Sequence, residues 1–498
     1  MTVNEMKTPD ARTETPDSRV DASLRVPLLA LFGGAAFWLV AGSVLAMIAS
    51  IKFHAPAFLA ACSWLTYGRV QPAADDALLY GFCIPAGLGV ALWLFAQLGQ
   101  APLRGAIVPV VAAKLWHLGV LIGLAGILSG NSTGFAWLEF PRAGSVVLFF
   151  AYLLLALWAM INFAARHERA LFPSHWFLVA ALFWFLWIYS TANLFLVACP
   201  VRGVVQFAIN SWFANNLLFV WLALVGIGAA FYFLPKFSGR PLQSYYLSLF
   251  AFGTLVLFGT WCGIPPGAPL PAWMPALSSV AATLTVVPVL AIGVIAWQTV
   301  CGSNHCKLKG GSFCFIRFGT LSFVLSSLML IATACPRISR VTEFTWFGPA
   351  QTQLQLYGFF AMTMFGAIYH LLPRVVGFDW PFPKLARVHF WLSLSGVLLL
   401  VLPLAIGGVV QGLKLNHPEI GFMDALKATL PFLRVSTIGL MLLLFGNLLF
   451  ALNIFGLAFV WEKALVKKVF AAVTAPLETE GEAGSASASL RRDKEVWT

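Results

Sequence analysis

The stretch "WFGPAQTQLQLYGFFAMTMFGAIYH", which runs from Trp346 to His370, has the length and apolar character of a membrane-spanning helix. Its first turns carry three glutamines, Gln351, Gln353 and Gln355. An amide inside a bilayer needs a hydrogen-bond partner, because no water is available there to satisfy it. The stretch therefore predicts a transmembrane helix whose glutamines lie against a polar, walled cavity.

The rest of the chain has the composition of a polytopic membrane protein. Of its 498 residues, 60% are hydrophobic and 10% are charged, and the mean hydropathy is +0.86. A soluble protein of this size could not cover its surface with polar groups at this balance. Apolar runs of about 20 residues, the length that crosses a bilayer, predict an all-α fold of twelve transmembrane helices. We place them at residues 27–50, 77–98, 106–129, 144–164, 173–199, 210–234, 245–263, 275–300, 314–335, 351–373, 388–413 and 429–461.

Polar segments flank this single membrane domain, which we place at residues 27–462. Residues 1–26 and 463–498 have little apolar surface to bury, so we expect two disordered ends. Most of the 31 Lys and Arg residues fall on the side of the membrane that holds both termini. Such residues accumulate on the cytoplasmic side, so we expect both termini there. Contacts with anionic lipid explain the net charge of +12 without a nucleic-acid partner.

One predicted cytoplasmic loop combines cysteine and histidine. Cys301, Cys306 and Cys314 occur there with His305. Both residue types bind zinc, but the C-x4-C-x7-C spacing lacks the paired C-x2-C of structural zinc sites. Free thiols in a reducing compartment are the favoured interpretation, and a zinc site is the alternative.

Several segments resemble subunit I of the cbb3-type cytochrome c oxidases, a branch of the heme-copper oxidases. They are "WLTYGRVQPAADDALLYGF" (64–82), "FANNLLFVWLALVGIGAAFYFLPKFSGRPLQSYYLS" (213–248), "AMTMFGAIYHLLPRVVG" (361–377), "HFWLS" (389–393) and "VVQGL" (409–413). The resemblance implies the twelve-helix oxidase bundle in a bacterial inner (cytoplasmic) membrane. It also implies six histidines on four helices that bind two hemes and one copper ion.

None of these histidines is present at the matching positions of this chain. The heme ligands fall on Ala74, Gln351 and Gln353, and the copper ligands fall on Asn215, Pro265 and Pro266. We call these six residues the ligand positions. An amide oxygen is a poor ligand for heme iron, and imidazole suits both heme iron and copper. We therefore expect no heme, no copper and no catalytic residues.

Other family positions divide into lost and retained ones. The family's active-site tyrosine falls on Gly259, and a family glutamate falls near Met329. The chain keeps Arg69, Arg240, Pro241, His370, His389 and Arg434. Arg69 and Arg434 match arginines that lie near heme propionates in the family. Their retention leaves a bound tetrapyrrole as an alternative.

The eight histidines of the chain offer few substitutes for the missing ligands. His117 lies in the middle of a predicted span, and we interpret it as a hydrogen-bonded residue in a polar helix contact. A heme bound at new histidine positions is the alternative.

The helix that carries the glutamines adds expectations about the interior of the bundle. Residues i and i+2 of a helix point about 200° apart, so Gln351 and Gln353 should face opposite sides of their helix. We expect both amides to be buried and paired, in a cavity smaller than two hemes need. Larger side chains should fill the lost volume, and Phe359 and Phe360 are candidates.

These observations favour a non-catalytic structural or regulatory subunit of a respiratory electron-transfer complex. Its partners would be membrane lipid, other oxidase subunits and c-type cytochromes. Helix packing alone explains the substitutions less well, since unrelated changes would not all fall on ligand positions. A transporter or ion-conducting protein on the emptied scaffold is the alternative, with Lys114 and Asp76 as ionisable groups in the membrane. An active terminal oxidase is the third possibility.

Overall fold

The computed structural model describes residues 16–301 and 311–474, and this part of the chain is all-helical, without strands. Eleven of its helices are long and apolar enough to cross a membrane, and Tyr245–Gly259 is a shorter apolar helix at the seventh predicted span. Together they occupy the twelve predicted segments. The all-α membrane fold is therefore confirmed.

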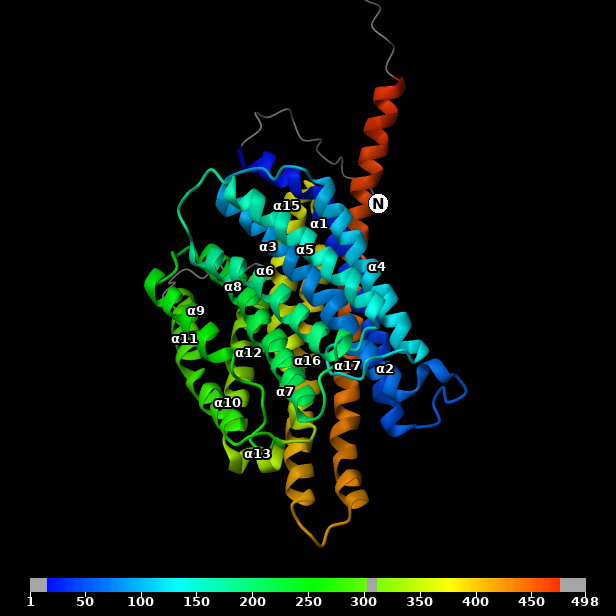
Figure 1. The fold of residues 1–498 in the computed structure, drawn as a ribbon. Coiled ribbons are helices and arrows are strands. Elements are labelled where there is room, and N and C mark those ends of the chain that lie inside the picture. Colours follow the sequence, from blue (N-terminus) through cyan, green and yellow to red (C-terminus); the bar gives the residue numbers. More distant parts are fainter. Residues whose placement is uncertain (1–15, 302–310, 475–498) are drawn as a thin grey trace, which may run out of the picture.

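The helices follow one another with short connections and pack side by side as a bundle (Figure 1). They are α1 (Pro16–His54), α2 (Tyr67–Asp76), α3 (Ile84–Gly99), α4 (Ile107–Ser129), α5 (Arg142–Ala164), α6 (Pro173–Ala192), α7 (Val204–Asn215), α8 (Leu222–Ser238), α9 (Tyr245–Gly259), α10 (Trp273–Leu284), α11 (Val286–Cys301), α12 (Gly311–Thr333), α13 (Pro336–Thr342), α14 (Phe347–Gln353), α15 (Met362–Val376), α16 (Pro383–Leu415) and α17 (Phe422–Thr474). A 3-10 turn, η1 (Ser63–Leu65), precedes α2. Four π-helical segments are η2 (Ala77–Cys83), η3 (Asn193–Ala198), η4 (Asn216–Trp221) and η5 (Leu354–Ala361).

Three spans form the centre of the bundle. In the most apolar window of Tyr67–Gly99, Val204–Ser238 and Phe347–Val376, 94%, 89% and 83% of the residues are buried. The corresponding share is 50% or less in the other eight spans. A helix that is buried all round needs no polar face, which explains the near-continuous apolar sequence of these three. They carry four of the six ligand positions.

Residues 19–26 are part of the folded bundle, so the disordered end predicted at 1–26 is wrong for this part. Helix α1 begins at Pro16, and Leu24 is fully buried. The Asp21 carboxylate accepts hydrogen bonds from Arg374 Nε at 2.7 Å and Trp93 Nε1 at 3.0 Å. Arg25 Nε donates to the Val375 carbonyl at 2.9 Å. The polar residues that suggested disorder are thus paired inside the bundle.

The other predicted end also needs correction. Helix α17 continues to Thr474, beyond the predicted boundary at residue 463. It extends past the rest of the bundle in Figure 1. Adding one residue to an existing helix gains a hydrogen bond without a new nucleus, and Ala, Leu and Lys in "KALVKK" (463–468) favour helix. Residues 475–498 lie outside the described part.

The seventh span ends earlier than predicted. Helix α9 stops at Gly259 rather than 263, and Pro265 and Pro266 lie in the following loop. Gly263 there has φ of +104°, in the region that favours glycine. The two prolines then prevent a new helix from forming, because they lack N–H groups.

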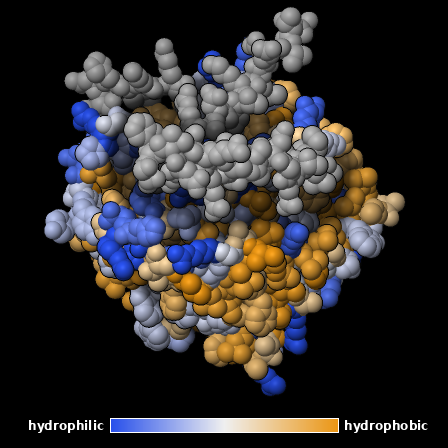
Figure 2. Space-filling view, turned by 90° about the horizontal axis from the view of Figure 1, so that it is seen from above, coloured by the Kyte–Doolittle hydropathy of each residue, from blue (hydrophilic) through white to orange (hydrophobic). Residues whose placement is uncertain are grey.

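The predicted cluster of cysteine and histidine lies mostly outside the residues that the structure describes. The predicted Cys and His cluster falls on residues 302–310 and the Cys301 side chain, outside the described residues; Cys314 alone is placed, in α12. Figure 2 looks down the bundle from the end at which α1 begins and shows large hydrophobic areas on the coloured surface, with hydrophilic side chains among them. This surface suits a chain surrounded by lipid.

Candidate functional site

Each central span changes its helical winding at a ligand position. The π-helical η4 begins directly after Asn215, and η5 begins directly after Gln353. The π-helical η2 begins three residues after Ala74. A π-turn inserts an extra residue into a helix, redirects the side chains around it and is frequent at functional sites. The backbone therefore has a special geometry at or within three residues of these positions.

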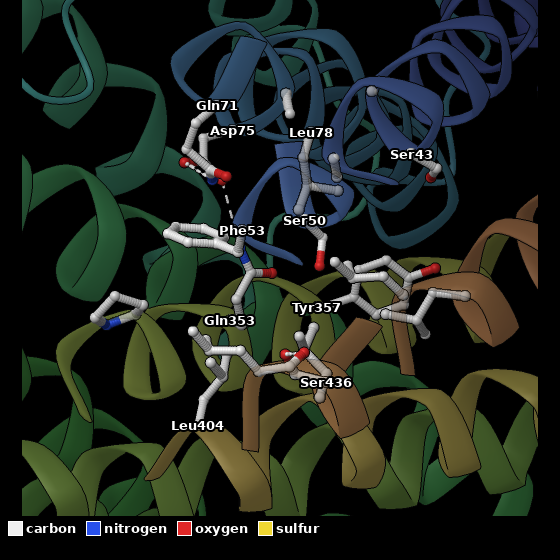
Figure 3. A pocket seen from close by; sticks show the side chains of 18 of the residues that line it. Ser43, Ser50, Phe53, Gln71, Asp75, Leu78, Gln353, Tyr357, Leu404 and Ser436 are labelled. Carbon is white, nitrogen blue, oxygen red and sulfur yellow. Dashed lines mark hydrogen bonds between the residues drawn. The ribbon is translucent and has the colours of Figure 1, made fainter. Parts of the chain in front are cut away.

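The two heme-ligand positions Ala74 and Gln353 line one cavity of about 100 Å³, which we call the Asp75 cavity. Figure 3 shows Gln71 and Gln353 converging on the Asp75 carboxylate at one end of it. Gln71 Nε2 donates to Asp75 Oδ2 at 2.8 Å, and Gln353 Nε2 approaches Asp75 Oδ1 at 3.4 Å. This contact links α14 to α2 where the family places a heme ligand on each.

The far side of the Asp75 cavity has its own polar contacts. The hydroxyl of Tyr357 donates to Asn447 Oδ1, and Asn447 Nδ2 donates to Ser43 Oγ at 2.7 Å. These residues come from η5, α17 and α1. Hydroxyl, amide and carboxylate groups from distant parts of the chain thus surround this small cavity.

Gln351 faces the opposite side of its helix. It lines a cavity of about 350 Å³, which we call the Gln351 cavity, together with Asn215, Ser326 and Gln355. An adjoining cavity of about 240 Å³ is lined by Gln351, Pro265 and Pro266. The structure therefore separates the ligand positions into two groups, one on each side of the α14 helix. This confirms the opposite directions expected from the i and i+2 spacing.

The expected burial of the two glutamines is wrong. Gln351 and Gln353 are half-buried, and each lines a cavity that is not fully enclosed. The buried amide is Gln355, with 6% exposure. It accepts a hydrogen bond from Ser326 Oγ at 2.5 Å and donates to the Leu218 carbonyl at 3.2 Å. All three glutamines lie in the first turns of the same predicted span, so only tertiary packing distinguishes their burial.

The copper-ligand position Asn215 has a structural contact. Its Nδ2 donates to the Gly259 carbonyl at 2.8 Å and joins α7 to the end of α9. The neighbouring Asn216 is fully buried and donates to the carbonyls of Trp212 and Thr260. Asparagines thus hold two helix ends together where copper ligands are expected in the family.

The residues present do not fit two hemes and a copper ion. None of the histidines in the described part of the chain lines the Asp75 cavity, the Gln351 cavity or the adjoining one. A cavity of about 150 Å³ accepts benzene, so one of 100 Å³ is too small for a heme. The rings of Phe359 and Phe360 are fully buried, and Phe360 lies 6.0 Å from the Trp221 ring. Aromatic side chains therefore occupy the interior beside η5.

Three of the described histidines make contacts inside the bundle. His117 lies in the predicted helix contact, on Gly34 of α1, and the backbone of Ala30 and Leu31 is within hydrogen-bonding reach of its ring. His389 Nδ1 lies 3.1 Å from the Tyr369 hydroxyl, and His370 packs between Phe233 and Phe237.

The retained arginines do not point to a bound tetrapyrrole. Arg69 donates to the carbonyls of Ser63 at 3.1 Å and Leu128 at 3.2 Å. Arg434 is exposed on α17. Neither lines the Asp75 cavity. Backbone contacts explain the position of the Arg69 side chain, and Arg434 is exposed on the surface of α17.

The two ionisable residues of the transporter alternative lie apart from any common path. Lys114 is on the exposed face of α4. Asp76 is buried, with 1% exposure, and faces Glu139 of the loop between α4 and α5. Sequence reasoning missed Asp75 and Glu139; the acidic pair "DD" inside an apolar span was the available signal for the former.

Comparisons with known proteins agree with this architecture. A family model described as "Cytochrome C and Quinol oxidase polypeptide I" matches residues 26–442. A cytochrome c oxidase subunit 1 homolog of Azorhizobium caulinodans is 22% identical over 90% of this chain and 85% of its own. A cbb3-type cytochrome c oxidase subunit CcoN1 of Stutzerimonas stutzeri is 23% identical over 84% of this chain and 91% of its own.

The fold is also similar to a solved structure. One chain of a heme-copper terminal oxidase dimer superposes with a TM-score of 0.66, at 14% identity, over 90% of this chain and 84% of its own. At this identity the likeness concerns the fold alone.

Proposed function

This chain belongs to the cytochrome c and quinol oxidase polypeptide I family, and we propose that within it the chain serves as a non-catalytic structural or regulatory subunit of a respiratory electron-transfer complex. One observation carries the proposal: none of the six ligand positions supplies an imidazole, and none of the histidines that the structure describes lines the cavities beside them. Oxidase chemistry needs such ligands to hold heme iron and copper.

The bundle has protein contacts where the family has cofactors. Gln353 reaches Asp75 of α2, and Asn215 reaches the end of α9. Gln355 bonds to Ser326 of α12 and to Leu218 of η4. Hydrogen bonds between buried polar groups fix how helices pack in a membrane. These contacts support a scaffold that keeps its shape without cofactors.

The relatives are named as oxidase subunits, which supports a place beside other subunits for this chain. We propose that its lipid-facing helices dock against membrane respiratory subunits, c-type cytochromes among them, with both termini in the cytoplasm. The transporter alternative has less support, since Lys114 is on an outer face and Asp76 is paired with another carboxyl group.

The test is purification of the tagged chain from native membranes in mild detergent. We expect co-purification of other respiratory subunits, with heme absorbance that follows those partners and is absent after the chain is separated from them. Deletion of the chain should lower the amount of assembled complex more than the turnover of each remaining oxidase.

Two results would contradict the proposal. One is recovery of the chain as a lone monomer with oxidase levels unchanged by deletion, which would favour the transporter alternative. The other is oxygen reduction by the isolated chain, which would favour an active oxidase.

A further inference from the structure

Two carboxyl groups meet at the end of the bundle that carries the Asp75 and Gln351 cavities. Asp76 ends α2, and Glu139 lies in the 130–141 loop between α4 and α5. The two side chains are within hydrogen-bonding reach of each other. Asp76 is 1% exposed, and the Oε2 atom of Glu139 is buried.

In the described part of the chain no cation pairs with these carboxyl groups, and the donors within reach are the backbone N–H groups of Trp137 and Glu139, which serve Glu139 alone. Neither oxygen of Asp76 accepts a hydrogen bond from a donor, and neither does Glu139 Oε2. The guanidinium groups of Arg69 and Arg142 donate to the carbonyls of Leu128 and Val197 instead. Two buried carboxylates cannot both stay ionised at short range without compensation.

The other titratable groups around the pair are acidic or neutral. Asp75 of α2 adds a further carboxylate, and Tyr80 of η2 and Tyr189 of α6 lie close enough to Asp76 to interact with it electrostatically. The Tyr80 hydroxyl donates to the Trp137 carbonyl at 2.6 Å, and the buried Tyr189 hydroxyl is within hydrogen-bonding reach of Ser145 and Asn193. Burial raises the pKa of Glu139 to about 8, and the Asp75 carboxylate adds to the rise.

We propose that Asp76 and Glu139 bind one proton between them, and that this shared proton fastens the 130–141 loop to α2 where the loop lines the Gln351 cavity. The proton makes one carboxyl group a donor and leaves the other as an acceptor, which satisfies oxygens that otherwise have no partner. A hydrogen bond between a carboxyl group and a carboxylate is charge-assisted and therefore strong.

The 130–141 loop contains a strained backbone position, so it depends on contacts with neighbouring elements to keep its conformation. Trp137 has φ of +67°, an unfavourable value for a residue other than glycine. Ala136 and Trp137 line the Gln351 cavity. The Tyr80 contact and the carboxyl pair both hold this turn against the first central span, so loss of the proton should release the part of the loop that lines the cavity.

The direction of the pH effect follows from proton linkage. The Glu139 pKa is about 8 in the docked loop and near 4.5 in an ordinary carboxyl group. The docked loop therefore binds more protons, and its docking weakens as pH rises from about 4.5 to about 8. Opening should become up to about tenfold more favourable per pH unit, the limit for one proton.

Hydrogen exchange of residues 131–140 in the purified full-length chain tests the idea. After correction for intrinsic rates, exchange should accelerate with pH in the wild type. Glu139→Gln keeps a donor toward Asp76, so its exchange should be slow and independent of pH. Glu139→Ala should exchange fast at every pH. Glu168→Gln, at an exposed carboxylate in the α5–α6 loop, should behave as the wild type.

Carbodiimide labelling provides a second readout that does not depend on loop motion. A protonated carboxyl group adds its O–H across a C=N bond of dicyclohexylcarbodiimide and rearranges to a stable N-acylurea. At neutral pH we expect mass-spectrometric labelling of Asp76 or Glu139 and none of Glu168. Wild-type pH dependence in Glu139→Gln, or equal labelling of Glu139 and Glu168, would overturn the proposal.

Discussion

The amides of Gln351, Gln353 and Gln355 lie on one helix but have different surroundings. Gln355 is buried and bonds to two other helical segments. Gln353 is half-buried and makes one long contact with Asp75, which also receives a shorter bond from Gln71. The energetic cost of losing an amide depends on which groups stay buried without a partner. The two positions should therefore respond differently to the same substitution.

Gln355→Leu should destabilise the protein by about 1–3 kcal/mol, because it leaves the Leu218 carbonyl and the Ser326 hydroxyl buried with fewer partners. Gln353→Leu should be near neutral, because Asp75 keeps its bond to Gln71. Thermal unfolding of both variants in the same detergent measures the difference. Equal destabilisation by the two substitutions would contradict this reading, and loss of a measurable activity in Gln353→Leu alone would give that residue a function.

The directions of the Gln351 and Gln353 side chains were predictable from the sequence, but their burial was not. The spacing of Gln351 and Gln353 predicted that they face opposite sides, and the cavities confirm it. Direction follows from helix geometry, which is local. Burial depends on neighbours far along the chain, such as Asp75 and Ser326, and no local pattern contains that information.

At the scale of elements, glycines set the spacing between α16 and the short helices before η5. A Cβ atom at Gly412 would lie 1.6 Å from the Val341 carbonyl oxygen, and one at Gly408 would lie 2.2 Å from the Phe347 nitrogen. Both neighbours are backbone atoms, which cannot turn aside as a side chain can. These glycines therefore fix how closely α16 approaches α13 and α14, and through α14 the position of Gln351 and Gln353.

Gly412→Ala should displace α16 from α13 and cost at least about 1–3 kcal/mol, as overpacked interiors do. Gly348→Ala is the matched control, since no atom lies within 4 Å of its added Cβ and alanine favours helix over glycine. The yield of monodisperse protein and its melting temperature in detergent measure both effects. Similar behaviour of the two variants would show that the close approach of α16 is not required.

The start of α1 is joined to two other helices by Asp21. Its carboxylate bonds to Arg374 of α15 and Trp93 of α3. Asp21→Ala should cost about 1.5–3 kcal/mol, the range for bonds with a charged partner. Asp424→Ala, which removes an exposed pair with Lys427 at 4.0 Å, should have no measurable effect on unfolding. An unchanged melting temperature in Asp21→Ala would mean that residues 16–26 add nothing to the fold.

For the whole molecule, hydrophobic length was sufficient to predict the twelve segments, because a bilayer imposes one span length on every helix. The ends of the bundle were not predictable in the same way. Arg25 and Asp21 read as solvent-exposed, but bond to partners more than 70 positions away in sequence. The division into two cavities was also not predictable, since the residues that line each cavity come from helices far apart in the sequence.

Replacement of the ligands and filling of the interior together should exclude heme. We expect the purified chain to lack a stoichiometric Soret band and to lack copper by metal analysis. A variant that restores two imidazoles tests whether the missing histidines or the missing space excludes heme. In Ala74→His/Gln353→His, two histidines would face the Asp75 cavity, whose volume is about 100 Å³. A site that small is below the 150 Å³ that accepts benzene, so pyridine hemochrome analysis of the double variant should still find no stoichiometric heme. One heme per chain in this variant would show that the space is retained and that the histidines alone were lost.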